Sequence, residues 1–200
     1  MLKHIDDSGR VVFTNAMLPL QDFPHLVETH LSRISHTIQL ETAGKQLAAS
    51  DFPKVELEGF ILRVCTWGGY AGIAGRVFNQ NDPRHIRHQF IQAASFLNGT
   101  STDIQGALES LNQIRQLGTP SFASKHLRFL RPDICPVLDS KNVTLGYSFN
   151  PKGYRQFAQD CARIAHALEV HAIENPIKRP HRTWFVGDID MAIFAHLNKW

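Results

Sequence analysis

The chain has 200 residues, of which 43% are hydrophobic and 20% are charged, and its formal net charge is +3. This composition excludes wholesale disorder, and without a run of about 18 apolar residues we expect no membrane-spanning helix. The opening residues lack the apolar core of a signal peptide, and the three cysteines are scattered in apolar sequence. We therefore expect a cytoplasmic protein with buried thiols and no disulfide framework.

The charge is distributed unevenly along the chain. Residues 1–60 contain five Lys or Arg and eight Asp or Glu (net −3), whereas residues 61–200 contain sixteen and ten (net +6). The net positive charge of residues 61–200 is compatible with a polyanionic partner, although an ordinary mixed surface also explains a charge of this size.

The predicted elements begin with a short strand over residues 9–14 and continue almost entirely as helices. Apolar residues recur at helical spacing from Phe23 to Ile38, after Asp22 as a candidate N-cap. A second helix starts after Asp51 and ends at the paired glycines Gly68 and Gly69. Further helices are predicted over 70–79, 84–98, 102–117, 151–171 and 184–197. The fold class is therefore all-α with at most a minor N-terminal strand, a two-lobed helical domain covering residues 1–200.

A helix-hairpin-helix is predicted within residues 102–131. Only Gly118, Thr119, Pro120 and Ser121 separate the apolar stripe that ends at Leu117 from the stripe of the next helix. Gly118 can adopt the left-handed conformation that ends a helix, and Pro120 suits the first turn of the next one. Backbone N–H groups at such a turn can bind phosphate. On the second helix one face is polar and cationic, and the candidate DNA-binding residues are Gly118, Thr119, Ser121, Ser124, Arg128 and Arg131, with Lys125 on the same face. A solvated helix face explains the same residues equally well.

The connector after this helix leads to Asp139. Residues 134–138 are apolar and few, so they must fold back and bring Asp139 to the start of another helix, over 140–147, close to the polar face of the hairpin. An aspartate in that place is also an ordinary N-cap.

These residues resemble the helix-hairpin-helix DNA glycosylases, particularly the 8-oxoguanine and adenine-mispair branches. In that superfamily a hairpin of the type L-x-G-x-G-x-x-x-A precedes P-[VI]-x-D, and here Leu117 to Ala123 precede Pro136-Val137-Leu138-Asp139. The match covers about 30 residues. The glycine pattern is altered, and a gapless alignment places Ser121 where bifunctional members carry a lysine, with Lys125 four residues later on the same helix face.

The resemblance implies a DNA glycosylase that acts on double-stranded DNA containing a damaged or modified base. Asp139 would stabilise positive charge on the deoxyribose or activate the nucleophile. Lys125 would attack the sugar and form a Schiff base if burial or the nearby Arg128 lowers its pKa, and otherwise it would bind phosphate while water acts as the nucleophile. Both the bifunctional and the monofunctional reaction remain open at this point.

Three other residues are candidates for a base pocket. Trp67 and Tyr70 flank a flexible turn and could stack on a flipped base, although Trp67 could equally close the core at a helix end. Asp188 could line a cleft, and an acidic first helical turn explains it just as well. The iron–sulfur loop of some superfamily members needs four cysteines, so we expect no such cofactor and no metal.

Two other functions compete with a monomeric DNA glycosylase. One is a non-catalytic protein that uses the same hairpin to hold DNA, and the other is a helical protein-interaction domain whose hairpin is coincidental. A steep salt dependence of DNA binding would separate the first two functions from the third.

Overall fold

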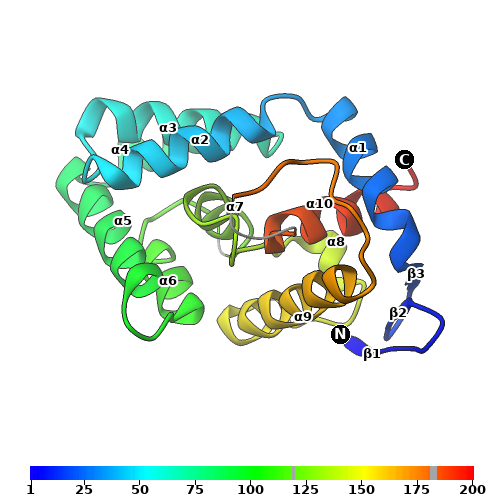
Figure 1. The fold of residues 1–200 in the computed structure, drawn as a ribbon. Coiled ribbons are helices and arrows are strands. Elements are labelled where there is room, and N and C mark those ends of the chain that lie inside the picture. The colour runs from blue at the N-terminus through cyan, green and yellow to red at the C-terminus, as the bar shows by residue number, and fades with distance from the viewer. Residues whose placement is uncertain (119, 181–183) are drawn as a thin grey trace. The chain divides into compact units, whose positions relative to one another are not determined.

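Helices form most of the chain, as the computed structural model in Figure 1 shows for residues 1–118, 120–180 and 184–200. Within these residues there are ten α-helices, one short 3₁₀ helix and a three-stranded sheet near the N-terminus. The predicted mainly helical fold is confirmed. None of the helices described has both the length and the apolar character that crossing a membrane requires.

The chain divides into two compact units. We call residues Met1–Ser35 and Pro132–Trp200 the terminal unit, and residues His36–Arg131 the central unit. The predicted helix-hairpin-helix, residues 102–131, lies wholly in the central unit.

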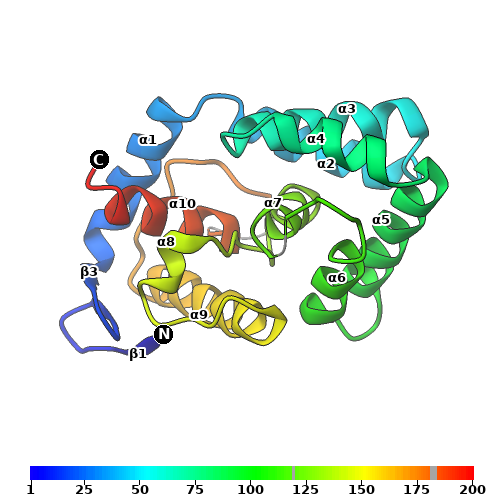
Figure 2. The same ribbon diagram turned by 180° about the vertical axis from the view of Figure 1, so that it is seen from behind.

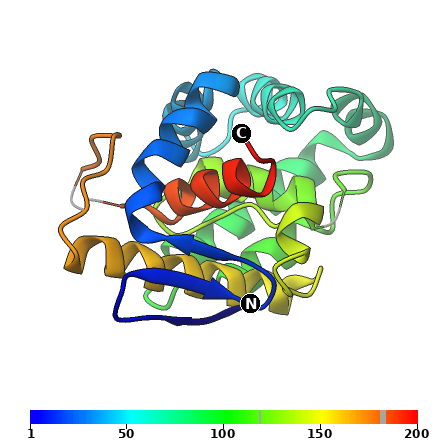
Figure 3. The ribbon, with the colours of Figure 1, turned by 90° about the vertical axis from the view of Figure 1, so that its right-hand side faces the viewer.

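The terminal unit begins with an antiparallel sheet of order β1-β2-β3, made of β1 (Leu2–Ile5), β2 (Arg10–Phe13) and β3 (Met17–Pro19). Gly9 supplies a positive φ of 74° at the turn before β2. Val11 pairs with Leu18, and both side chains are buried. The sheet lies beside α9, as Figure 3 shows. The predicted single strand corresponds to β2, whereas its two partners, β1 and β3, were not predicted.

The helices of the terminal unit surround the carboxyl-terminal helix. They are α1 (Phe23–Arg33), α8 (Ser140–Val143), α9 (Pro151–Val170) and α10 (Val186–Leu197), with the 3₁₀ helix η1 (Leu20–Asp22) before α1. α1 packs against α10, and so does α9. The first helix was expected to continue to Ile38, but α1 ends at Arg33, because the backbone leaves the helical region at Ile34 (φ −115°, ψ 86°). His36, with a left-handed φ of 69°, then precedes α2.

Six of the helices described lie in the central unit. They are α2 (Thr37–Ala49), α3 (Lys54–Trp67), α4 (Gly72–Gln80), α5 (Pro83–Asn98), α6 (Ile104–Leu111) and α7 (Ser121–Leu130). Figure 2 shows α5 and α6 side by side. α2 approaches α7 through Gly44, where a Cβ would lie only 2.1 Å from the carbonyl oxygen of Phe129. A glycine is therefore required for the two backbones to come this close.

The connection before α7 differs from the predicted tight turn. The preceding helix, α6, ends at Leu111, whereas the sequence predicts a helix continuing to Leu117. Residues 112–117 form successive turns, in which Gln116 has a φ of 67°. Ile114 and Leu117 remain buried, so the apolar spacing continues after the helix has ended. Gly118 has the predicted positive φ, 79°.

Candidate functional site

Lys125 lies on α7 with its side chain turned toward the start of the same helix. Only 7% of its surface is exposed. Its Nζ donates a hydrogen bond of 2.8 Å to the hydroxyl of Ser121, and it lies 4.7 Å from the centre of the Phe122 ring. Positions i and i+4 share a helix face, so the amine reaches the first residue of the helix. A cation above an aromatic ring is stabilised by the negative face of that ring.

Gly68 at the end of α3 bounds the Lys125 side chain. A Cβ at this glycine would lie 2.9 Å from Lys125 Cδ and 2.8 Å from Phe122 Cε1, closer than carbon atoms approach. The missing side chain therefore leaves the space that the lysine stem occupies. Cys65, one turn earlier on α3, is buried as well, and burial raises the pKa of its thiol to about 12 despite the opposing charge of Lys125. Cys65 is therefore a neutral neighbour of the lysine.

The connection before α7 is held by Asn81, which follows α4. Its amide oxygen accepts a 2.9 Å hydrogen bond from the backbone N–H of Arg115, and its amide nitrogen donates to the carbonyl of the same residue at 2.9 Å. Gly118 is exposed, and its carbonyl accepts from the N–H of Phe122 at 2.9 Å. The turn that the sequence predicts for phosphate binding is therefore accessible at Gly118, whereas Thr119 lies outside the described residues.

The other predicted DNA-binding residues of α7 have partners within the central unit. Arg128 is completely buried and forms an ion pair of 2.5 Å with Glu41 on α2. Ser124 is also buried, and its hydroxyl donates to the carbonyl of Ser121. Arg131 donates to the carbonyl of Leu97 at the end of α5. These contacts hold α7 in its unit and do not form an exposed cationic face, so they lend the predicted DNA contacts of Ser124 and Arg128 no support.

Asp139, in the terminal unit, caps the short helix α8. Its Oδ1 accepts hydrogen bonds from the N–H groups of Lys141 (2.9 Å) and Asn142 (3.3 Å). Both hydrogen bonds of the cap go to Oδ1, so the cap itself does not use Oδ2. Asn142 is completely buried, and its amide donates to the carbonyl of Val137 at 2.5 Å, which fixes the connector that precedes Asp139.

The two aromatic candidates for a base pocket differ in exposure. Trp67 donates its indole N–H to the hydroxyl of Thr37 at 2.9 Å and meets the ring of Phe129 edge-on at 4.8 Å. It therefore packs α3 against α2 and α7. Tyr70 is 53% exposed, and Arg76 lies over its ring at 4.9 Å while donating to its hydroxyl. Of these two candidates, Tyr70 is thus the one that a ligand of the central unit can reach.

Asp188 on α10 is completely buried and accepts several hydrogen bonds. Its donors are the amide of Asn175 (2.8 Å), the guanidinium of Arg179 and the N–H of Phe185 (3.0 Å). Arg179 is itself only 6% exposed and lies over the Phe185 ring. The carboxylate therefore fastens the segment before α10 to the first turn of that helix.

Two of the predicted site residues, Ser121 and Lys125, are thus in direct contact. Ser121 lies three residues after the exposed Gly118. Asp139 and Asp188 belong to the terminal unit. Sequence reasoning missed Gly68 and Asn81, whose partners are distant in sequence. It also missed the side chain of Asn142, although an asparagine three residues after a capping aspartate is a local signal.

No protein-family model, curated protein or solved structure shows a significant match to this chain. Among the residues described, no group of three or more His, Cys, Asp and Glu side chains could hold a metal ion. Function is therefore inferred from the side chains themselves.

Proposed function

We propose that the protein is a DNA glycosylase that removes a damaged or modified base, with Lys125 and Asp139 as its catalytic residues. The observation that carries this proposal is the 2.8 Å contact between Lys125 Nζ and Ser121 Oγ. Ser121 is the position where the resemblance to helix-hairpin-helix glycosylases expects a nucleophilic lysine. The amine of Lys125 therefore lies next to the expected place, although the lysine itself is four residues later.

The reaction requires a base that has left the helical stack, at a cost of a few kcal/mol. The lone pair of the neutral Lys125 amine attacks C1′ of the deoxyribose. The glycosidic C–N bond breaks, and its electron pair leaves with the base, which takes up a proton. The lysine nitrogen then gives a proton to the ring oxygen O4′, the C1′–O4′ bond breaks with its electron pair left on O4′, and the nitrogen lone pair forms the C1′=N bond of the protonated Schiff base. Asp139 matches the catalytic aspartate of the superfamily that the sequence resembles, and we assign it the negative charge that stabilises the sugar as positive charge grows on it.

A monofunctional enzyme would use the same aspartate and a water molecule. In that case Lys125 binds a phosphate near the turn at Gly118, and no covalent intermediate forms. The distinction between the two mechanisms is experimental, because a Schiff base can be reduced to a stable adduct and a water-derived product cannot.

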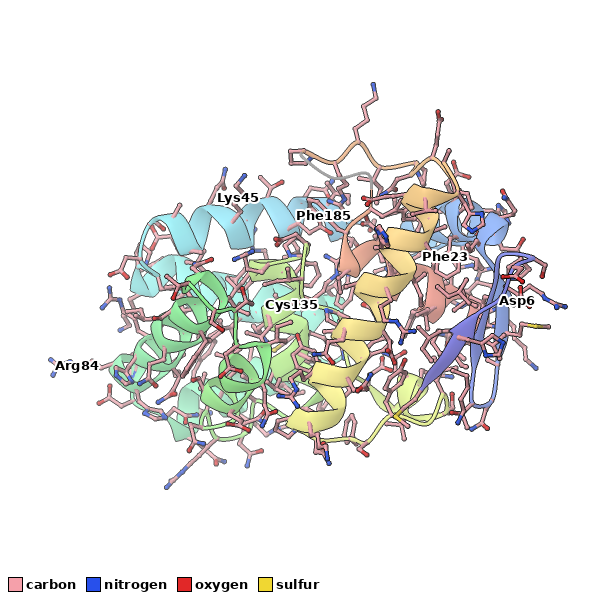
Figure 4. All side chains as sticks on the ribbon, turned by 60° about the horizontal axis from the view of Figure 1, so that its bottom comes forward. Asp6, Phe23, Lys45, Arg84, Cys135 and Phe185 are labelled. Atoms are coloured by element: carbon pink, nitrogen blue, oxygen red, sulfur yellow. The ribbon has the colours of Figure 1, made fainter. Side chains whose placement is uncertain are left out.

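The test is borohydride trapping together with base release on a panel of duplexes that carry oxidised, mispaired and modified bases. The variants are Lys125→Gln and Asp139→Asn. Their matched controls are Lys45→Gln, an exposed lysine on α2 (Figure 4), and Asp103→Asn, which changes the N-cap of α6 in the same way. We expect a trapped adduct from the unmodified protein and both controls, none from Lys125→Gln, and slow base release from Asp139→Asn.

If Lys125 and Asp139 act in one reaction, the double variant should be no slower than the slower single variant, because residues that act as a unit are non-additive. Base release without any adduct would support the monofunctional reaction. DNA affinity with a steep salt dependence but no base release would leave a non-catalytic DNA-binding protein, and no affinity for DNA would favour a protein-interaction domain.

A further inference from the structure

We propose that Ser121 is the positioning residue of Lys125: its hydroxyl, together with the Phe122 ring, holds the lysine amine in the orientation for attack on the sugar. This inference rests on the function proposed above. It assigns Ser121 a role different from the phosphate contact that the sequence predicts for it.

Three features of the central unit restrict the Lys125 side chain. The Ser121 hydroxyl accepts from Nζ at 2.8 Å, and the Phe122 ring lies 4.7 Å from the same atom. Gly68, which follows α3, lies so close to the methylene groups of Lys125 that a Cβ on the glycine would lie 2.9 Å from Lys125 Cδ and 3.1 Å from Lys125 Cε. A lysine has four rotatable bonds and a mobile amine, so these contacts remove freedom that a reacting amine would otherwise have to lose.

The hydroxyl suits both protonation states of the amine. A serine oxygen accepts a hydrogen bond from the ammonium, and after deprotonation the rotating O–H can donate to the neutral nitrogen. The Phe122 ring favours only the ammonium. Ser121 can therefore keep the amine in place while it loses the proton that blocks its lone pair.

The titratable groups that Lys125 influences in this unit do not change their charge near neutral pH. Burial raises the pKa of Cys65 on α3 to about 12 and lowers that of His126 on α7 to about 4. Arg128 on α7 and Glu41 on α2 are engaged with each other. The dependence of adduct formation on pH between about 5 and 9 is therefore not set by Cys65 or His126.

The experiment measures the single-turnover rate of borohydride-trapped adduct against pH, and DNA affinity at each pH. The variants are Ser121→Ala, which removes the hydroxyl, and Ser121→Thr, which keeps it. The control is Ser95→Ala, an exposed serine on α5. In Ser121→Ala we expect a plateau rate about tenfold lower and a midpoint about one pH unit more acidic, because the hydroxyl binds the charged ammonium more strongly than it binds the neutral amine. Ser121→Thr should restore both values, and DNA affinity should stay within about twofold.

The possible failures are distinguishable. An unchanged rate profile in Ser121→Ala, with the adduct still forming, overturns the positioning role and leaves the glycosylase proposal standing. Weaker DNA binding with an unchanged profile makes Ser121 a phosphate contact and also overturns it. If the unmodified protein forms no adduct on any duplex, Lys125 is not the nucleophile, and both the Schiff-base reaction and the positioning role are wrong.

Discussion

His126 should make the stability of the protein fall steeply below pH 6.5. The side chain is completely buried on α7, where its ring meets the rings of Phe60 and Phe90 edge-on at 5.9 and 5.7 Å. Its Nδ1 lies 2.6 Å from the carbonyl oxygen of Phe122, so Nδ1 carries the proton of a neutral imidazole and donates it. A charged ring would have to be accommodated among hydrocarbon side chains.

The pKa of His126 is lowered from 6.5 to about 4, mainly by burial, with a smaller contribution from the charge of Lys125 and an opposing one from the Phe122 carbonyl. Between these two values the unfolded chain binds a proton that the folded chain does not. Stability is therefore unaffected by this group above about pH 7 and is lost as the pH falls from 6.5 toward 4. The full difference corresponds to about 3 kcal/mol, at ~1.4 kcal/mol for each pH unit.

The perturbation is His126→Gln, which keeps an amide donor for the Phe122 carbonyl but cannot be protonated. Urea unfolding followed by circular dichroism gives the free energy of unfolding of both proteins at intervals from pH 7.5 to 4.5. We expect the advantage of the unmodified protein over the variant to shrink by about 2–3 kcal/mol over this range. Parallel curves for the two proteins would refute the reasoning, because they would mean that His126 takes up its proton equally well in both states.

Three further predictions concern packing and buried charge, and each is measured by urea unfolding at pH 7.5. Gly44→Ala should lower the free energy of unfolding by ~3 kcal/mol or more, because its Cβ would lie 2.1 Å from a backbone oxygen of α7. The control Gly59→Ala, whose Cβ would have no atom within 4 Å, should raise it by ~0.5–1 kcal/mol. Equal effects of the two substitutions would contradict the close approach of α2 and α7. Glu41→Gln should cost ~3 kcal/mol, because it removes the carboxylate that faces the buried charge of Arg128, and a cost below ~1 kcal/mol would mean that water reaches this pair. Asp188→Asn should lower the free energy of unfolding by ~3 kcal/mol and increase proteolysis of the segment before α10, because Asp188 accepts hydrogen bonds from this segment. Unchanged proteolysis would mean that Asp188 does not hold the segment in place.

The positions of most helices could be predicted from sequence because their signals are local. Pro83 opens α5, the glycines after Trp67 end α3, and Asp139 caps α8. No separate helix was predicted over α2, and two helices were predicted too long because they end without glycine or proline. The segments after these two helices contain His36 and Gln116, both in a left-handed conformation that sequence reasoning expects first of glycine. At both places the apolar residues keep their spacing beyond the end of the helix, so periodicity alone predicts a helix that is too long.

The same distinction applies to the candidate site. Ser121 and Lys125 are four residues apart on one helix, so helix geometry alone predicts that they can meet. Gly68 contacts Lys125, which is 57 residues later, and Asn81 accepts a hydrogen bond from Arg115, which is 34 residues later. No local sequence pattern predicts such contacts. Burial was also underestimated, because the polar positions of α7 were assigned to solvent although Glu41 supplies an internal partner for Arg128.

The first turn of α7 contacts the amine of Lys125, whereas the later turns of α7 hold the helix in the central unit. Its first turn carries the Ser121 hydroxyl and the Phe122 ring, which contact the amine of Lys125. The later residues carry packing and buried charge, namely His126 among aromatic rings and Arg128 against α2. Substitutions in the later turns should change the free energy of unfolding while the folded fraction keeps its rate of adduct formation. Substitutions of Ser121 should change that rate and its pH dependence without a comparable loss of stability, because an exposed or half-exposed alanine in a first turn costs little.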